Sequence, residues 1–237
     1  MSLFTRQLTL NVQLPDGFTF ENFVFNENRL LVRDQLEGTD SVWLTGAYST
    51  GKTHLLSALA CANDQTALYL PADELIASCD PTMLDGLEAT YCLVFDDIDK
   101  LAQTVAWSEA LFHLFNRHHA QGGRWVCSSQ VAPRYVDTPL ADLRSRFTLF
   151  PAFELGNYND QERVKIFSER ARFRGIKVNE DVYPYITNPR PRDLKYWLQL
   201  LDQLDQASLA EQRKVTIPLV KSVLQQNESL RRQLSLT

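Results

Sequence analysis

The sequence predicts an α/β body, in which a parallel sheet is covered by helices on both faces, followed by a small all-helical domain. Apolar runs without polar alternation alternate with helical patterns, as expected for a parallel sheet that is buried on both sides. A glycine-rich motif joins the first run to the first helix behind it, and from residue 159 onward only helical patterns remain. The predicted strands are 42–44, 67–70, 91–95, 125–127 and 147–150.

Residues 46–53 match the phosphate-binding pattern G-x-x-x-x-G-K-[ST] in full. Gly46 and Gly51 permit the tight turn that aims backbone N–H groups at an oxyanion, and the following helix adds its positive dipole. Lys52 would reach the terminal phosphates, and the Thr53 hydroxyl would bind Mg²⁺ beside them. Chance is the alternative, although only about one chain in a hundred of this length would carry the pattern. The residues predicted to hold a nucleoside di- or triphosphate are Gly46, Ser49, Thr50, Gly51, Lys52 and Thr53.

Two carboxylates follow the apolar run 91–95. A magnesium-bound nucleotide needs a carboxylate at the end of a neighbouring strand, and we predict that Asp96 supplies it. Asp97 is predicted to polarise an attacking water, since hydrolysis needs a nucleophile oriented toward the γ-phosphorus. The alternative is that residues 96–99 only form a helix N-terminus, where negative charge is favourable.

Charge is distributed unevenly along the chain, whose net charge is −5. Residues 1–155 carry 10 Lys and Arg against 19 Asp and Glu, whereas residues 156–237 carry 14 against 10. We therefore predict a domain boundary near residue 155, and neither half is basic enough for a compact DNA-binding module. The predicted organisation is a flexible N-terminal segment 1–17, an α/β domain 18–155, a helical lid 156–225 and a C-terminal tail 226–237.

The four cysteines form no C-x-x-C pair and have no histidine at metal-ligand spacing, so we expect reduced thiols. No basic segment followed by an apolar stretch opens the chain, and no apolar run approaches the roughly 18 residues that span a membrane. We expect a cytoplasmic protein.

Helical patterns predict a long helix over residues 107–120 and four helices after residue 159. On the long helix, His118 lies on the apolar stripe and is expected to pack rather than to bind a ligand. The first later helix is opened by Asn159 and Glu162, which have the spacing of a capping box, and the third carries an apolar stripe over 194–204.

Five segments together resemble the DnaA family of bacterial replication initiators, which are AAA+ nucleotide-binding proteins. They are the aromatic segment 18–23, the loop 46–53, Asp96-Asp97-Ile98, Ser145-Arg146-Phe147 and Pro191-Arg192-Asp193-Leu194. The chain is more similar still to the Hda family of DnaA-related regulators. Gln7-Leu8-Thr9-Leu10 matches that family's clamp-binding box, and residues 201–205 and 213–218 look like its lid. The initiator's helix-turn-helix domain has no counterpart behind the lid, so contact with DNA is expected to be mainly indirect.

The resemblance implies an adenine nucleotide, ADP or ATP, with Mg²⁺ as cofactor. Lys52 and Thr53 become its phosphate and metal contacts, and Asp96 becomes the metal carboxylate. Arg192 becomes a lid arginine that senses the phosphates. Arg146 becomes an arginine finger, which must stand on an exposed rim to reach the nucleotide of a neighbouring subunit.

Two positions depart from the pattern of the initiators. They carry an aspartate after the fourth strand, where this chain has Ser128-Ser129-Gln130, and Gln130 can take no negative charge. The lid has Arg190-Pro191-Arg192, which leaves open which arginine points inward. Taken alone, Arg146 could equally be a solvated surface charge.

The resemblance implies a regulator that is tethered to the DNA sliding clamp and promotes hydrolysis of the ATP bound to the initiator, which represses re-initiation. Two alternatives stay open. One is a self-contained AAA+ ATPase or loader, and the other is an adaptor whose nucleotide only stiffens the hinge between body and lid. The expected partners are the clamp and the initiator DnaA, without a membrane, and a homo-oligomer stays open because AAA+ domains often assemble.

The pattern Q-L-x-L occurs near both ends of the chain. The first copy provides Gln7, Leu8 and Leu10, and the second provides Gln233, Leu234 and Leu236. In an extended segment the two leucines point to the same side and can enter an apolar groove. Chance would produce one copy in about one chain in ten. We predict that the first copy anchors the clamp, because Val12 can serve as a further anchor, and that the second is a weaker or coincidental contact.

Overall fold

The structure, a computed structural model, describes residues 17–187, 194–211 and 215–234. Its contacts divide the chain into two compact units. The first unit is built mainly from Glu27–Gly46 and Gly51–Leu155, and the second from Gly156 onward together with Glu21–Asn26 and Ala47–Thr50. Within the described ranges, no helix is both long and apolar enough to cross a membrane.

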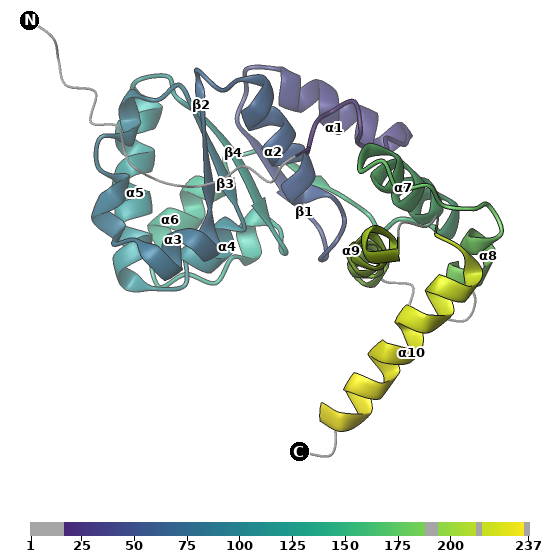
Figure 1. The fold of residues 1–237 in the computed structure, drawn as a ribbon. Coiled ribbons are helices and arrows are strands. Elements are labelled where there is room, and N and C mark those ends of the chain that lie inside the picture. Colours follow the sequence, from purple (N-terminus) through teal and green to yellow (C-terminus); the bar gives the residue numbers. More distant parts are fainter. Residues whose placement is uncertain (1–16, 188–193, 212–214, 235–237) are drawn as a thin grey trace, which may run out of the picture. The chain divides into compact units, whose positions relative to one another are not determined.

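The first unit alternates strands with helices, as the apolar runs of the sequence predict (Figure 1). Its strands are β1 (Val42–Thr45), β2 (Ala67–Pro71), β3 (Cys92–Asp96), β4 (Arg124–Ser129) and β5 (Ala152–Glu154). Its α-helices are α1 (Glu27–Glu37), α2 (Lys52–Ala62), α3 (Ala72–Ser78), α4 (Ile98–Leu101), α5 (Val105–Ala120) and α6 (Ala141–Phe147). Short 3-10 helices occur at Pro81–Leu84, Leu87–Ala89 and Pro133–Tyr135.

The five strands pair in parallel, in the order β2-β3-β4-β1-β5. Helix α2 covers one face of the sheet, and α5 and α6 cover the other (Figure 1). Val42, Trp43 and Leu44 point alternately to the two faces, and all three are fully buried. The predicted fold class is therefore confirmed. Since parallel strands have their carboxyl ends at one edge of the sheet, the loops after β1, β3 and β4 come together there.

The prediction of a strand at residues 147–150 is wrong, because the fifth strand lies further along the chain at Ala152–Glu154. Phe147 ends α6, and Phe150 lies in the turn that follows. Both rings are buried against Trp43 of β1, with centroid separations of 4.9 and 6.1 Å. The run is apolar because its two phenylalanines pack in the core, one from the end of a helix and the other from a turn. The true strand is an edge strand with mostly exposed residues, so it lacks the apolar signal.

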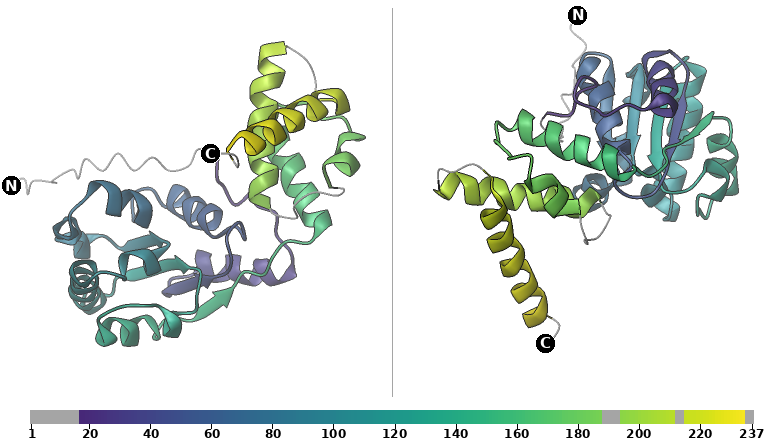
Figure 2. Two further views of the ribbon diagram at one scale, coloured as in Figure 1. Left: turned by 90° about the horizontal axis from the view of Figure 1, so that it is seen from below. Right: turned by 90° about the vertical axis from the view of Figure 1, so that its right-hand side faces the viewer.

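In the described part of the second unit, the structure has four helices, as predicted: α7 (Asp160–Phe173), α8 (Val182–Thr187), α9 (Leu194–Glu211) and α10 (Ile217–Leu234). The capping box at the start of α7 is confirmed. Asn159 Oδ1 accepts from the Glu162 N–H at 2.9 Å, and Glu162 Oε2 accepts from the Asn159 N–H at 2.7 Å. The views in Figure 2 show α10 running across α9, and the core of this unit is built around Trp197 and Leu201.

Helix α10 continues to Leu234, so residues 226–234 of the predicted C-terminal tail are helical. The physical reason is that no glycine or proline follows Pro218, while the residues after Leu224 are mostly good helix formers. Gln233 and Leu234 therefore lie in a helix and not in the extended segment that we expected. Gln7, Leu8, Leu10 and Leu236 lie outside the described residues.

His118 is fully buried on α5 and packs as predicted. Its Nδ1 accepts a hydrogen bond from Trp125 Nε1 at 2.9 Å, so that its Nε2 donates to the carbonyl oxygen of Thr90 at 2.6 Å. Gly123 leaves room for the ring, since a Cβ there would lie 2.1 Å from His118 Cε1. Burial lowers the pKa of His118, and the hydrogen bond from Trp125 requires the neutral imidazole, because a protonated Nδ1 cannot accept.

We expect this neutral histidine to make the folded protein less stable in mild acid. A lowered pKa in the folded state contributes stability that is present above the unfolded value of about 6.5 and is lost as the pH falls below it. The free energy of unfolding of the parent should fall between pH 7.5 and 5.5. His118→Gln should show a smaller fall, whereas His113→Gln, which changes an exposed histidine of the same helix, should behave like the parent. Equal pH dependence in all three proteins would contradict this assignment.

Candidate nucleotide-binding site

The loop between β1 and α2 has the backbone of a phosphate-binding turn. Gly51 has φ 98°, and Ser49, which is not a glycine, has φ 63°. Such a conformation is uncommon for a residue with a side chain, and it occurs often in ligand-binding loops. The Thr50 hydroxyl donates to the carbonyl oxygen of Ala47 at 2.9 Å and holds the turn closed. Helix α2 begins at Lys52, directly behind this turn, so its N-terminal N–H groups are placed to bind an anion.

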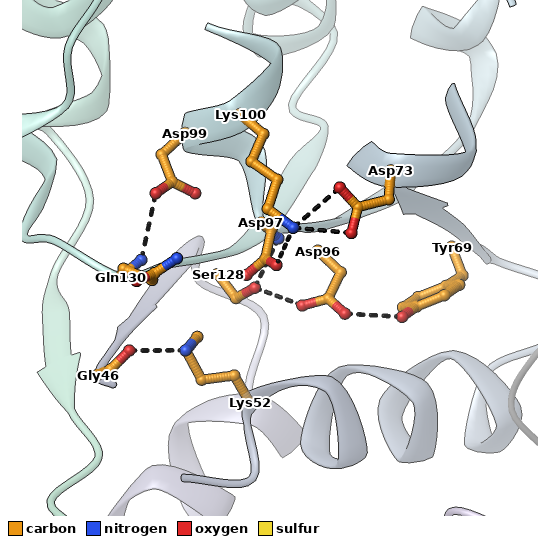
Figure 3. Close-up of polar contacts among 10 residues, drawn as sticks. All are labelled: Gly46, Lys52, Tyr69, Asp73, Asp96, Asp97, Asp99, Lys100, Ser128 and Gln130. Atoms are coloured by element: carbon orange, nitrogen blue, oxygen red, sulfur yellow. Dashed lines mark hydrogen bonds and ion pairs between the residues drawn. The ribbon is translucent and has the colours of Figure 1, made fainter. Parts of the chain in front are cut away.

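Lys52 is almost completely buried, with 6% of its surface exposed. Its Nζ donates to the carbonyl oxygen of Gly46 at 2.7 Å, which folds the side chain back over the loop (Figure 3). Burial lowers the pKa of Lys52, although the charges of Asp97, Asp96 and Asp99 oppose this shift. An ammonium held by a carbonyl oxygen beside the loop can exchange that partner for a phosphate oxygen at little structural cost.

Asp96 ends β3 and is held by hydroxyl groups from two neighbouring strands. Its Oδ1 accepts from Ser128 Oγ, and its Oδ2 accepts from the Tyr69 hydroxyl at 2.9 Å (Figure 3). Burial raises the pKa of Asp96, and hydrogen bonds from Ser128, Thr53 and Tyr69 oppose the rise. The influence of Thr53 on this pKa indicates that the two oxygen ligands that the sequence predicts for Mg²⁺ lie near each other.

The donor set fits a metal that is shared with a nucleotide. Across the described ranges, no three His, Cys, Asp or Glu side chains are grouped closely enough to form a protein-only metal site. Mg²⁺ commonly uses one or two protein oxygens and takes its remaining ligands from phosphate and water. Asp96 and Thr53 would therefore hold the ion, which would neutralise phosphate charge when bound.

Asp97 adopts the left-handed conformation, with φ 55°, directly after β3. Its N–H donates to Ser128 Oγ at 2.8 Å, and its Oδ2 lies 3.0 Å from Lys100 Nζ. It occupies the N-cap position of α4 but makes no side-chain capping bond there. Asp99 lies in the first turn of α4, so the arrangement also fits the alternative of a helix N-terminus at which negative charge is favourable.

Gln130 follows β4 beside another carboxylate. Its N–H donates to Asp99 Oδ2 at 3.3 Å, and its carbonyl oxygen accepts from Thr45 Oγ1 at 3.4 Å. Burial raises the pKa of Asp99, whose Oδ1 is buried without a hydrogen-bond partner among the described residues. An acidic side chain, which Gln130 does not provide, is thus present next to it in Asp99.

Sequence reasoning missed the roles of Tyr69, Asp99, Lys100 and Ser128. A signal existed for Tyr69, because a buried strand residue with a hydroxyl group usually finds a polar partner. Lys100 and Asp99 follow Asp96-Asp97 directly, but their spacing does not reveal which acidic or polar groups they meet.

Of the two arginines for which the resemblance implies a role, Arg146 lies among the described residues and Arg192 does not. Arg146 lies in the last turn of α6 and is exposed, with its Cζ 6.0 Å from the centroid of the Phe112 ring. The exposed position meets the physical requirement of an arginine finger, since its guanidinium is accessible to another molecule. Arg192 and its neighbour Arg190 lie outside the described residues.

Comparisons with known proteins agree with this architecture. The family model described as the bacterial DnaA ATPase domain matches residues 14–150, and the model described as the Hda lid domain matches residues 160–224. An uncharacterized protein of Haemophilus influenzae is 31% identical over 229 residues, which cover 92% of this chain and 98% of that protein.

Two solved structures of DnaA share the fold. Domain III of the replication initiation protein DnaA from Thermotoga maritima matches with a TM-score of 0.78 at 19% identity, covering 90% of this chain and 98% of that one. AMPPCP-bound DnaA from Aquifex aeolicus matches with a TM-score of 0.66 at 20% identity, covering 83% and 67% of the two chains. From the family models, the sequence relative and the shared fold, we conclude that the chain belongs to the Hda/DnaA-related AAA+ family.

Proposed function

We propose that the chain binds an adenine nucleotide, ADP or ATP, with Mg²⁺ and acts in the cytoplasm as a regulator of the DnaA initiator. The observation that carries the nucleotide assignment is the buried Lys52 behind the strained loop, whose Nζ donates to the carbonyl oxygen of Gly46. AMPPCP-bound DnaA, which shares the fold, supports an adenine nucleotide. Gly46, Ser49, Thr50 and Gly51 would complete the phosphate contacts, with Arg192 as a further contact from the lid.

The regulatory part of the proposal has the chain tethered to the DNA sliding clamp, where Arg146 promotes hydrolysis of the ATP bound to the initiator. The exposed guanidinium at the end of α6 supports this role. Charge delivered to the phosphates of a neighbouring subunit stabilises the transition state of phosphoryl transfer, and this accounts for promotion in trans. Contact with DNA would be mainly indirect, through the clamp.

A second candidate is a self-contained ATPase or loader. The observation that favours it is the proximity of Lys52, Asp96 and Asp97, which is the minimum set for binding a magnesium nucleotide and orienting water. In this case the chain would turn over its own nucleotide at a substantial rate, and the initiator would be unnecessary.

Steady-state ATP turnover distinguishes the two candidates. We would measure the chain alone, then with the initiator, and then with the initiator and DNA-loaded clamp. A regulator should show little turnover alone and a large increase only in the complete mixture. Equal turnover under all three conditions would exclude the regulatory role, and no turnover in any mixture would leave only the nucleotide-stiffened adaptor.

Clamp binding is predicted to depend on the first Q-L-x-L copy. Gln7→Ala should weaken binding to the clamp by about tenfold, because a glutamine amide makes several directed hydrogen bonds in a binding groove. Gln233→Ala should have a smaller effect, since α10 is helical at this position and an extended segment is needed to bring alternate leucines to one side. Surface-immobilised clamp would be titrated with each single variant and the double variant. Full affinity of Gln7→Ala, with loss in Gln233→Ala, would reverse the ranking of the two copies.

A further inference from the structure

Lys100 lies between two carboxylates next to the nucleotide site. Its Nζ is 2.9 and 2.7 Å from the two oxygens of Asp73, in the first turn of α3, and 3.0 Å from Asp97 Oδ2 (Figure 3). The side chains of Lys100 and Asp97 are 25% and 23% exposed, whereas that of Asp73 is 75% exposed. The contact with Asp97 is thus the more shielded of the two.

The Lys100 ammonium keeps its positive charge. Burial acts to lower the pKa of Lys100, but hydrogen bonds and charge interactions with Asp73 and Asp97 outweigh it, so that the pKa is raised. Lys100 therefore stays protonated throughout the physiological pH range. Its positive charge faces Asp97 whatever the pH at which the protein works.

The backbone of Asp97 is held in place beside this partner. The residue is held in the left-handed conformation, and its N–H is fixed by Ser128 Oγ. Ser128 in turn donates to Asp96, which anchors the whole turn to the site. Lys100 lies three residues further along, in α4, so the ion pair joins two residues of the same turn of backbone.

An ion pair of this kind works against the role proposed for Asp97. A carboxylate orients an attacking water by accepting a hydrogen bond from it, and its tendency to do so falls when an ammonium shares its charge. Here the ammonium lies within hydrogen-bonding distance of one of its two oxygens.

We propose that Lys100 is a positioning residue that holds Asp97 in an ion pair and thereby keeps the chain's own nucleotide hydrolysis slow. This inference rests on the proposed function, in which the nucleotide is bound at residues 46–53 and Asp97 faces the attacking water. It explains how a chain with Lys52, Asp96 and Asp97 in place can remain loaded with nucleotide while it acts on another protein.

The test is hydrolysis of ATP by the isolated chain, measured at saturating nucleotide beside the affinity for a fluorescent ADP. Lys100→Met should raise the turnover number by about tenfold, a modest part of what a released general base can contribute. Its nucleotide affinity should stay within about twofold of the parent, because no direct phosphate contact is removed. Lys100→Gln provides a second variant should Lys100→Met unfold, which thermal melting would reveal.

Two further variants separate this role from general charge or packing effects. Lys100→Arg keeps a cation between the two carboxylates and should remain as slow as the parent. Arg117→Gln removes a basic residue that also bridges two carboxylates, Asp85 and Glu88, at 3.4 Å each, and it should leave turnover unchanged.

The outcomes distinguish the inference from the function on which it rests. Unchanged or lower turnover of a folded Lys100→Met or Lys100→Gln variant that still binds ADP would overturn the inference alone. Loss of ADP binding in these variants would also overturn it, since Lys100 would then belong to the binding site. Failure of the parent to bind ADP would instead refute the proposed nucleotide site, and the inference with it.

Discussion

Arg146→Ala is expected to lower the stimulation of initiator ATP hydrolysis by about 10³-fold, the scale on which an arginine finger acts. The loss arises because the guanidinium would supply charge to phosphates held by another protein. Since Arg146 is exposed on α6 and its described ring contact is with Phe112, its removal should leave both the fold and nucleotide binding of this chain intact. Single-turnover hydrolysis of initiator-bound ATP, with DNA-loaded clamp present, measures the effect.

Arg144→Ala is the matched control for this prediction. Arg144 lies in the same helix two residues earlier and is only partly exposed. The Arg144→Ala variant should stimulate the initiator like the parent, which would separate the finger from a general basic surface. Normal stimulation by Arg146→Ala would show that another group supplies the charge.

Lys52→Ala is expected to weaken nucleotide binding by about 100-fold, because charge-assisted hydrogen bonds to phosphate contribute up to about 3 kcal/mol. The fold should survive. Lys52 is almost completely buried, and burial lowers its pKa because the charged form of the side chain is disfavoured there. Removing this side chain should therefore cost the folded state little free energy. Without nucleotide, the melting temperature of the variant should therefore be close to that of the parent.

Titration with a fluorescent ADP analogue, read beside thermal melts with and without ADP, measures both parts of this prediction. The parent should be stabilised by ADP, whereas Lys52→Ala should not be at the same concentration. Undiminished ADP binding by a folded Lys52→Ala variant would remove the phosphate-binding role from this loop.

Features that depend on residues close together in sequence could be predicted. The loop 46–53 and the capping box at Asn159 are set by local backbone geometry, and their patterns are specific. The parallel sheet could be predicted as well, because strands that are buried on both faces need continuous apolar runs.

Features that depend on distant residues could not be predicted in the same way. Ser128 contacts Asp96 only because β3 and β4 are neighbours in the sheet. The sequence of each strand does not indicate which strand lies next to it. Lys100 meets Asp73 across 27 positions of sequence for a similar reason. At residues 147–150, an apolar run that packs in the core from a helix end resembled a strand, since burial alone does not identify the secondary structure.

We propose that this chain promotes hydrolysis of nucleotide held by the initiator rather than of nucleotide that it holds itself. The most direct test places γ-labelled ATP on one protein at a time, with unlabelled ADP on the other, in the presence of DNA-loaded clamp. We expect rapid release of labelled phosphate when the initiator carries the label, and slow release when this chain carries it. Rapid release from the chain, with no acceleration on the initiator, would instead identify a self-contained ATPase and exclude the proposed regulatory role.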